Sequence, residues 1–115
     1  MDHHSESPDH HCIYEDLYNS LSLLNDKTDT ENLFMDLCTP QELKSMAERW
    51  RVAQLIEKGL SYRNINEVTG VSTATITRVA RSLTQGSGGY AVLLKAKDQL
   101  RNEKTKNCDT KERKT

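Results

Sequence analysis

The chain contains few aromatic residues, few cysteines and no long apolar segment. Aromatic side chains make up 5% of its 115 residues, with one Trp and one Phe, and hydrophobic residues reach only 35%. A monomer of this size and polarity would have a thin core, so the composition favours one compact domain that shares its apolar surface in a homodimer. No apolar run approaches the roughly 20 residues that a membrane-spanning helix needs, so no membrane association is expected.

The three cysteines, Cys12, Cys38 and Cys108, are odd in number and lie far apart in the sequence. This pattern fits a reducing compartment better than a disulfide framework, and it favours a cytoplasmic setting. The acidic segment 1–6 lacks the apolar region of a secretion signal, which points to the same compartment.

The chain offers little metal-binding or catalytic chemistry. Two pairs of consecutive histidines and Cys12 could bind Zn²⁺ or Ni²⁺, but such pairs on a polar segment are not preorganised, so no metal site is predicted. The histidines are His3, His4, His10 and His11. No glycine-rich phosphate loop, nucleophile elbow or histidine paired with a nucleophile is present, so the chain is not expected to be an enzyme.

The net charge of −1 conceals a separation of charge along the chain. Residues 1–38 contain nine acidic residues and one lysine, a charge of −8. Residues 39–85 contain seven basic and four acidic residues, and residues 86–115 contain eight basic and four acidic residues. A basic surplus of this kind suits a DNA-facing surface, although simple solvation of exposed helices would also explain it.

The apolar residues recur at helical spacing, and no segment alternates as a strand would, so the sequence predicts an all-α fold. Thr28 with Glu31, and Thr39 with Glu42, match capping boxes that begin helices. The terminal segments 1–12 and 102–115 are polar and highly charged and are expected to be disordered. The expected helices span 13–24, 28–37, 39–58, 61–69, 73–84 and 90–101.

Residues 61–83 have the pattern of a helix-turn-helix. Ile65 and Val68 share one side of the first expected helix, and Gly70 stands where the turn needs a positive φ. Ser72 or the residue after it is a suitable N-cap for the second helix. That helix has an apolar stripe at positions i, i+3 and i+7, formed by Ile76, Val79 and Leu83.

The other faces of the second helix carry small polar residues and arginines, which suit base edges and phosphates in the major groove of double-stranded DNA. These residues are Thr73, Ala74, Thr75, Thr77, Arg78 and Arg81. Lys44 and Lys58, outside this helix, are expected to add salt-sensitive phosphate contacts.

Four strings in combination resemble the Trp repressor superfamily, and within it the YerC/YecD-like branch of small bacterial proteins. They are DLCTP at 36–40, RWRVA at 49–53, STATITRV at 72–79 and GSGGY at 86–90. The resemblance covers about residues 14–101. It implies a TrpR-like multi-helical bundle with a helix-turn-helix, in an intertwined homodimer.

In such a dimer, residues 13–37 would form the dimerisation helices, 39–58 the long core helix and 61–84 the helix-turn-helix. The resemblance implies a transcriptional regulator, a repressor, that reads a palindromic operator with recognition helices about 34 Å apart. The DNA-contacting segment of the family maps onto Arg63, Asn66, Thr73, Ala74, Thr75 and Thr77.

In the Trp repressor, an indole ligand lies against positions that fall here on Thr39, Arg49, Arg78 and Ser82. Each of the first three has another explanation: an N-cap for Thr39, an ion pair with a nearby carboxylate for Arg49, and a phosphate contact for Arg78. The resemblance alone therefore does not establish a ligand pocket.

Val79 stands where the Trp repressor has a glycine beside its ligand, and one residue fewer separates the long helix from the helix-turn-helix. A side chain at this position would crowd an indole, so we expect no cofactor and a pocket filled by protein rather than by a tryptophan-like corepressor. Two further functions stay open: a protein-interaction module on a helix-turn-helix scaffold, and a switch that responds to an amino acid or a metal.

Overall fold

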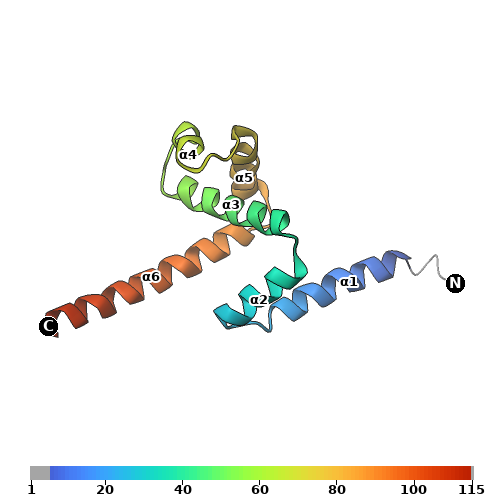
Figure 1. The fold of residues 1–115 in the computed structure, drawn as a ribbon, viewed down its shortest axis with the longest axis horizontal. Coiled ribbons are helices and arrows are strands. Elements are labelled where there is room, and N and C mark those ends of the chain that lie inside the picture. Colours follow the sequence, from blue (N-terminus) through green and yellow to red (C-terminus); the bar gives the residue numbers. More distant parts are fainter. Residues whose placement is uncertain (1–5, 115) are drawn as a thin grey trace. The chain divides into compact units, whose positions relative to one another are not determined.

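The computed structural model describes the backbone of residues 6–114 and the side chains of residues 11–103 (Figure 1). Within this range the chain forms six helices and no strand, which confirms the expected all-α fold. The chain divides into two compact units, Met1–Leu43 and Lys44–Thr115. The helices are α1 (Glu6–Leu21), α2 (Lys27–Leu37), α3 (Pro40–Glu57), α4 (Tyr62–Thr69), α5 (Thr73–Gln85) and α6 (Gly89–Lys114).

The first unit contains α1 and α2, whose apolar side chains lie largely at the surface. On α1, Ile13 is 63% exposed, and every residue from 11 to 20 is exposed. On α2, Met35 is exposed, whereas Leu33 and Phe34 are half-buried. None of the described side chains of this unit is buried, so its apolar stripes have no core of their own.

At its N-terminal end, α1 is longer than the sequence predicts. The backbone is helical from Glu6, where a disordered segment is expected over residues 1–12. Pro8 falls in the first turn, where a missing N–H removes no helical hydrogen bond. The helix ends at Leu21, and residues 1–5 lie outside the described residues.

The start of α2 corrects one prediction. The expected capping box of Thr28 and Glu31 is wrong, because the helix begins earlier and Asp26 is its N-cap. The Asp26 carboxylate accepts a hydrogen bond from the Asp29 N–H at 3.1 Å, and aspartate caps a helix at least as well as threonine. Glu31 instead accepts a hydrogen bond from the Lys27 ammonium at 3.2 Å.

Both ends of α3 are fixed by local hydrogen bonds, and the first of them is the capping box that the sequence predicts. The Thr39 N–H donates to Glu42 Oε1 at 2.8 Å, and the Glu42 N–H donates to Thr39 Oγ1 at 3.1 Å, which is a capping box. At the other end Gly59 adopts a φ of 94°, and the Leu60 N–H donates to the Leu55 carbonyl at 3.2 Å. This is a Schellman motif, which returns the chain toward α3.

The last helix also exceeds its expected length. α6 begins at Gly89 and continues to Lys114, whereas the sequence predicts a helix over 90–101 followed by a disordered segment over 102–115. No glycine or proline follows Gly89, and the lysine-rich sequence contains no residue that would end a helix. Within the described residues, no helix combines the length and the apolarity needed to cross a membrane.

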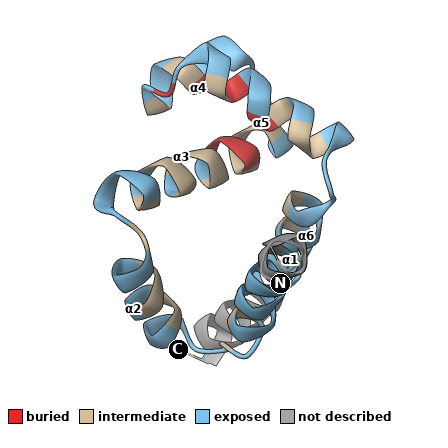
Figure 2. Cartoon of the chain, turned by 90° about the vertical axis from the view of Figure 1, so that its right-hand side faces the viewer, coloured by how far each residue is buried: buried red, intermediate tan, exposed pale blue. Residues whose placement is uncertain are grey.

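The core of the second unit lies where α4 and α5 pack against α3 (Figure 2). Its buried residues are Val52, Ala53, Ile65, Val71, Ile76 and Val79. Partly buried residues pack around them: Trp50, Leu55, Ile56, Leu60, Leu83 and Tyr90. Val68, expected on the apolar side of α4 with Ile65, is 56% exposed, so that part of the predicted stripe is wrong. Full burial of one aliphatic core side chain, such as that of Ile65, stabilises the fold by roughly 1.5–3 kcal/mol.

We predict that Gly70→Ala lowers the free energy of unfolding by about 1–2 kcal/mol, because an L side chain is disfavoured by that amount in the left-handed region. Gly70 has a φ of 76°, and no atom lies within 4 Å of the point that a Cβ would occupy, so strain and not a clash is expected. Gly89→Ala is the matched control, because Gly89 is equally open but has no positive φ. Urea denaturation measures both variants, and equal loss of stability in the two would contradict the prediction.

Candidate nucleic-acid interface

The helix-turn-helix is formed by α4, a three-residue turn and α5. Ser61 and Ser72 are the N-caps of the two helices, and each hydroxyl accepts a hydrogen bond from the N–H three residues on. Gly70 ends α4 with a φ of 76°, and its N–H donates to the Asn66 carbonyl at 2.8 Å. The prediction of Ser72 as an N-cap and of Gly70 as the turn residue is therefore confirmed.

The apolar sides of α4 and α5 determine which side of α5 faces solvent. Ile65, Ile76 and Val79 are 0–1% exposed and belong to the same core cluster as Val52. Because side chains three and four residues apart share a helix face, burial of Ile76 and Val79 leaves the opposite side of α5 outside. The core therefore presents the polar residues of α5 to solvent.

The predicted base-reading residues of α5 lie on this outer side. The structure leaves five of them exposed: Thr73, Ala74, Thr77, Arg78 and Arg81. Thr75 is half-buried, and its Oγ1 accepts a hydrogen bond from the Ser72 hydroxyl at 3.1 Å. The Thr75 hydroxyl proton remains for an external acceptor, such as a base edge in the major groove.

The two residues of α4 that the sequence predicts as DNA contacts, Arg63 and Asn66, differ in their exposure to solvent. Arg63 is exposed, and its Nε lies 3.5 Å from the Glu67 carboxylate, one helical turn away. An exposed pair of this kind is weak, so the guanidinium stays available to a phosphate. Asn66 is half-buried, and its Nδ2 donates to the Val71 carbonyl at 2.8 Å. Its side chain therefore acts inside the turn, a role that the sequence did not predict.

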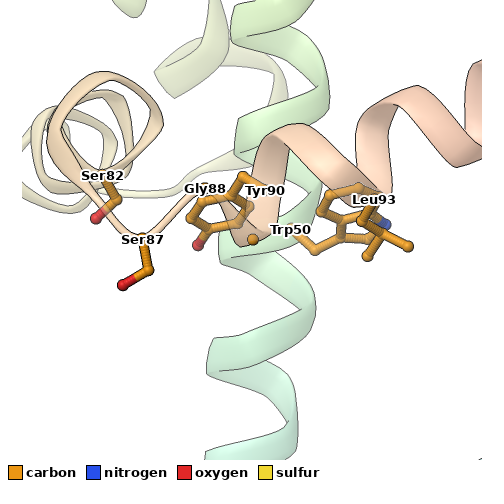
Figure 3. Close-up of a pocket in the computed structure, with 7 residues that line it drawn as sticks. Trp50, Ser82, Ser87, Gly88, Tyr90 and Leu93 are labelled. Carbon is orange, nitrogen blue, oxygen red and sulfur yellow. The ribbon is translucent and has the colours of Figure 1, made fainter. Parts of the chain in front are cut away.

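A cavity of about 420 Å³ lies where α3, α5 and the start of α6 meet (Figure 3). Trp50 and Tyr90 form an aromatic wall, with parallel rings whose centroids are 6.3 Å apart. Ser82 and Ser87 lie at the opposite end from Trp50 in this view. The complete lining is Trp50, Ser82, Ser87, Gly88, Gly89, Tyr90 and Leu93.

The four residues expected around a ligand are not brought together at this cavity. Of the three that belong to the second unit, Ser82 lines it, and Arg49 and Arg78 do not. The described residues supply no ion pair to either arginine, so the carboxylate partner expected for Arg49 is absent among them. Thr39 belongs to the first unit, where it forms the capping box of α3.

Val79 occupies the position at which the sequence disfavours an indole ligand. Its side chain is 1% exposed and lies within the core cluster that includes Val52 and Ile76. The space at that position is therefore occupied by the protein's own side chain.

The histidine-rich segment is described only in part. His3 and His4 lie outside the described residues, and the His10 side chain is not described. His11 lies on α1 with its Nε2 3.9 Å from the Glu15 carboxylate, and Cys12 beside it is exposed. Across the described residues, no three ligating side chains gather into a metal-binding group.

A helix-turn-helix on a long supporting helix defines a class of nucleic-acid-binding proteins. Comparison with known proteins narrows the class: the model of the family described as Trp repressor protein matches residues 14–98. The chain belongs to the Trp repressor family.

Three relatives place the chain within this family. It is 38% identical over 93 residues to the uncharacterised protein YerC of Bacillus subtilis, covering 81% of this chain and 86% of YerC. The crystal structure of a candidate Trp repressor from Staphylococcus aureus matches with a TM-score of 0.71 and 34% identity, over 76% of this chain and 87% of the other. A TrpR-like protein from Eubacterium eligens matches with a TM-score of 0.67 and 38% identity, over 71% and 84%.

Proposed function

We propose that the protein is a sequence-specific DNA-binding transcriptional regulator, and that it represses by occupying a palindromic operator as a homodimer. The observation that carries this proposal is the exposed polar side of α5, held outward by the burial of Ile76 and Val79. Membership of the Trp repressor family supports the same role. A binding function, not catalysis, is therefore proposed.

The dimer is supported by apolar side chains that the single chain leaves exposed on several helices. On α1 and α2 they include Ile13, Leu17, Met35 and Leu37, and on α6 Val92, Leu93 and Leu100. Exposed apolar residues that recur along helices are typical of surfaces that a partner covers. A second copy that covers them would also present two α5 helices to successive major grooves, about 34 Å apart.

We further propose that DNA binding does not need tryptophan. The buried Val79 side chain supports this, because it fills the position where the family's ligand would lie. The arginines expected to hold that ligand do not line the cavity near Ser82. Arg78 is exposed on α5, where its guanidinium can contact a DNA phosphate, so its presence does not require a bound ligand.

We predict that Arg63→Ala weakens binding to all DNA sequences alike, because Arg63 is placed to contact a phosphate. The slope of log affinity against log salt should become shallower by about one unit. Fluorescence anisotropy with labelled genomic fragments, titrated at several salt concentrations, measures both quantities.

Arg101→Ala on α6 is the control for this variant, since Arg101 is also exposed and paired with a carboxylate. It is expected to leave DNA affinity close to that of the wild type. If neither salt nor Arg63→Ala alters DNA retention, DNA binding through α4 and α5 is refuted. A stoichiometric protein partner recovered in that case would favour the interaction-module alternative.

We predict that Thr75→Ala relaxes discrimination at one base-pair position of each half-site, by about 0.5–1.5 kcal/mol for one lost hydrogen bond to a base. A selection of bound DNA fragments defines the site, and affinities for its single-base variants measure the effect. Thr84→Ala is the matched control, because Thr84 is exposed at the far end of the same helix. An unchanged preference at every position of the site would show that Thr75 reads no base.

We predict that millimolar L-tryptophan leaves the melting temperature unchanged, since a ligand that binds the folded state would raise it. The same measurement with related amino acids and with Zn²⁺ tests the alternative of a ligand-responsive switch. A concentration-dependent rise with any of these compounds would favour that alternative over a ligand-free regulator.

A further inference from the structure

We propose that Asn66 and Thr69 are positioning residues that hold the turn of the helix-turn-helix and so fix the orientation of the recognition helix α5. The effect on DNA rests on the proposed function, whereas the effect on the turn can be measured without DNA. Asn66 would then support DNA reading from inside the protein and would not contact DNA itself.

The proposal starts from Val71, the central residue of the turn. The residue is 6% exposed, so its backbone groups are largely removed from water. It lies between α4 and α5 and makes no backbone–backbone hydrogen bond among the described residues. A buried N–H or C=O group that lacks a partner destabilises the fold by about 1–3 kcal/mol. The turn therefore needs donors and acceptors from elsewhere.

Two side chains of α4 supply these partners. Asn66 Nδ2 donates to the Val71 carbonyl at 2.8 Å, and the Val71 N–H donates to Thr69 Oγ1 at 3.0 Å. The Thr69 hydroxyl in turn donates to the Ile65 carbonyl at 2.7 Å, which holds it against its own helix. Both backbone groups of Val71 are thus bonded to α4 through side chains.

This arrangement connects the turn to the function of α5. Ser72, directly after Val71, is the N-cap of α5, so the position of Val71 fixes where the recognition helix begins. Without the bonds from α4, the turn would sample other conformations in which α5 is misdirected. DNA affinity would then fall in proportion to the fraction of molecules that keep the binding geometry, whatever the DNA sequence.

The two asparagines of α4 differ in exposure and in bonding, and this difference favours a role for Asn66 in the turn over a direct contact with DNA. Asn64 is exposed, and its side chain has no hydrogen-bond partner among the described residues, whereas Asn66 is half-buried and bonded within the turn. A direct DNA contact needs an exposed amide with free donors. Asn66 is half-buried and its amide already donates to the Val71 carbonyl, so it meets this requirement poorly, although it is the predicted contact.

The test uses the full chain with Asn66→Ala and with Asn64→Ala as the matched control. Asn66→Ala is expected to reduce DNA affinity about 3- to 10-fold, the range of one lost hydrogen bond, on operator and non-operator DNA alike. The salt dependence should keep its slope, because no phosphate contact is removed. Asn64→Ala is expected to bind as the wild type does.

A second pair of variants tests the turn in the absence of DNA. Thr69→Val removes the hydroxyl with little change of shape, and Thr69→Ser keeps it. Amide hydrogen exchange is expected to be faster at Val71 in Thr69→Val and close to wild type in Thr69→Ser. Asn66→Ala should likewise speed exchange at Gly70 and Val71, since the turn it holds opens more often.

The outcomes separate this inference from the proposed function. If Asn66→Ala loses discrimination at a single base pair, or makes the salt slope shallower by about one unit, Asn66 contacts DNA and the inference is wrong. Unchanged exchange at Val71 in both Asn66→Ala and Thr69→Val also overturns it. If the wild type binds no DNA, the proposed function fails, while faster exchange in the two variants still supports their role in the turn.

Discussion

The packing of α4 and α5 onto α3 is the interaction on which the rest of the second unit depends. Val52 and Ala53 of α3 are completely buried, and they receive Ile65 from α4 and Ile76 from α5. Four fully buried aliphatic side chains at roughly 1.5–3 kcal/mol each represent a large share of the stability of so small a unit. The same packing turns the polar side of α5 outward, so the core and the candidate DNA surface are determined together.

Polar groups in the turn complement this apolar packing. Burying Val71 brings two backbone groups away from water, and α4 offers Asn66 and Thr69 to bond them. The hydrophobic contacts are non-directional and would tolerate small rotations of α5, whereas hydrogen bonds restrict both distance and angle. The apolar core thus stabilises the association of the helices, and the polar turn restricts their orientation.

Much of this arrangement follows from residues near each other in sequence. Local signals predicted the capping box at Thr39, the N-cap at Ser72, the positive φ of Gly70 and the burial of Ile76, because each depends on a few neighbouring residues. The role of Asn66 was missed, since it depends on where the chain returns after Gly70. The one available sequence signal for this role was a polar residue at a position of α4 that lies close to the turn before α5.

Other features were mispredicted because several sequence explanations compete. Thr28 and Asp26 are both good N-caps, and nothing local chooses between them. Val68 keeps helical spacing with Ile65, yet α4 is short and only one of its residues reaches the core. The set of ligand residues came from resemblance alone and stays a prediction; Ser82 lines the cavity beside Trp50, and Arg49 and Arg78 do not.

The proposal that DNA binding does not need tryptophan depends on the residue at position 79. A glycine there would leave space beside α5, and the helix could depend on a bound ligand to become well packed. Val79 occupies that position with its own side chain, which is 1% exposed and packs in the core of the second unit. A buried Val stabilises α5 in every molecule at all times, whereas a ligand stabilises it only when bound. This difference is the physical reason for the proposal that DNA binding by this protein does not need tryptophan.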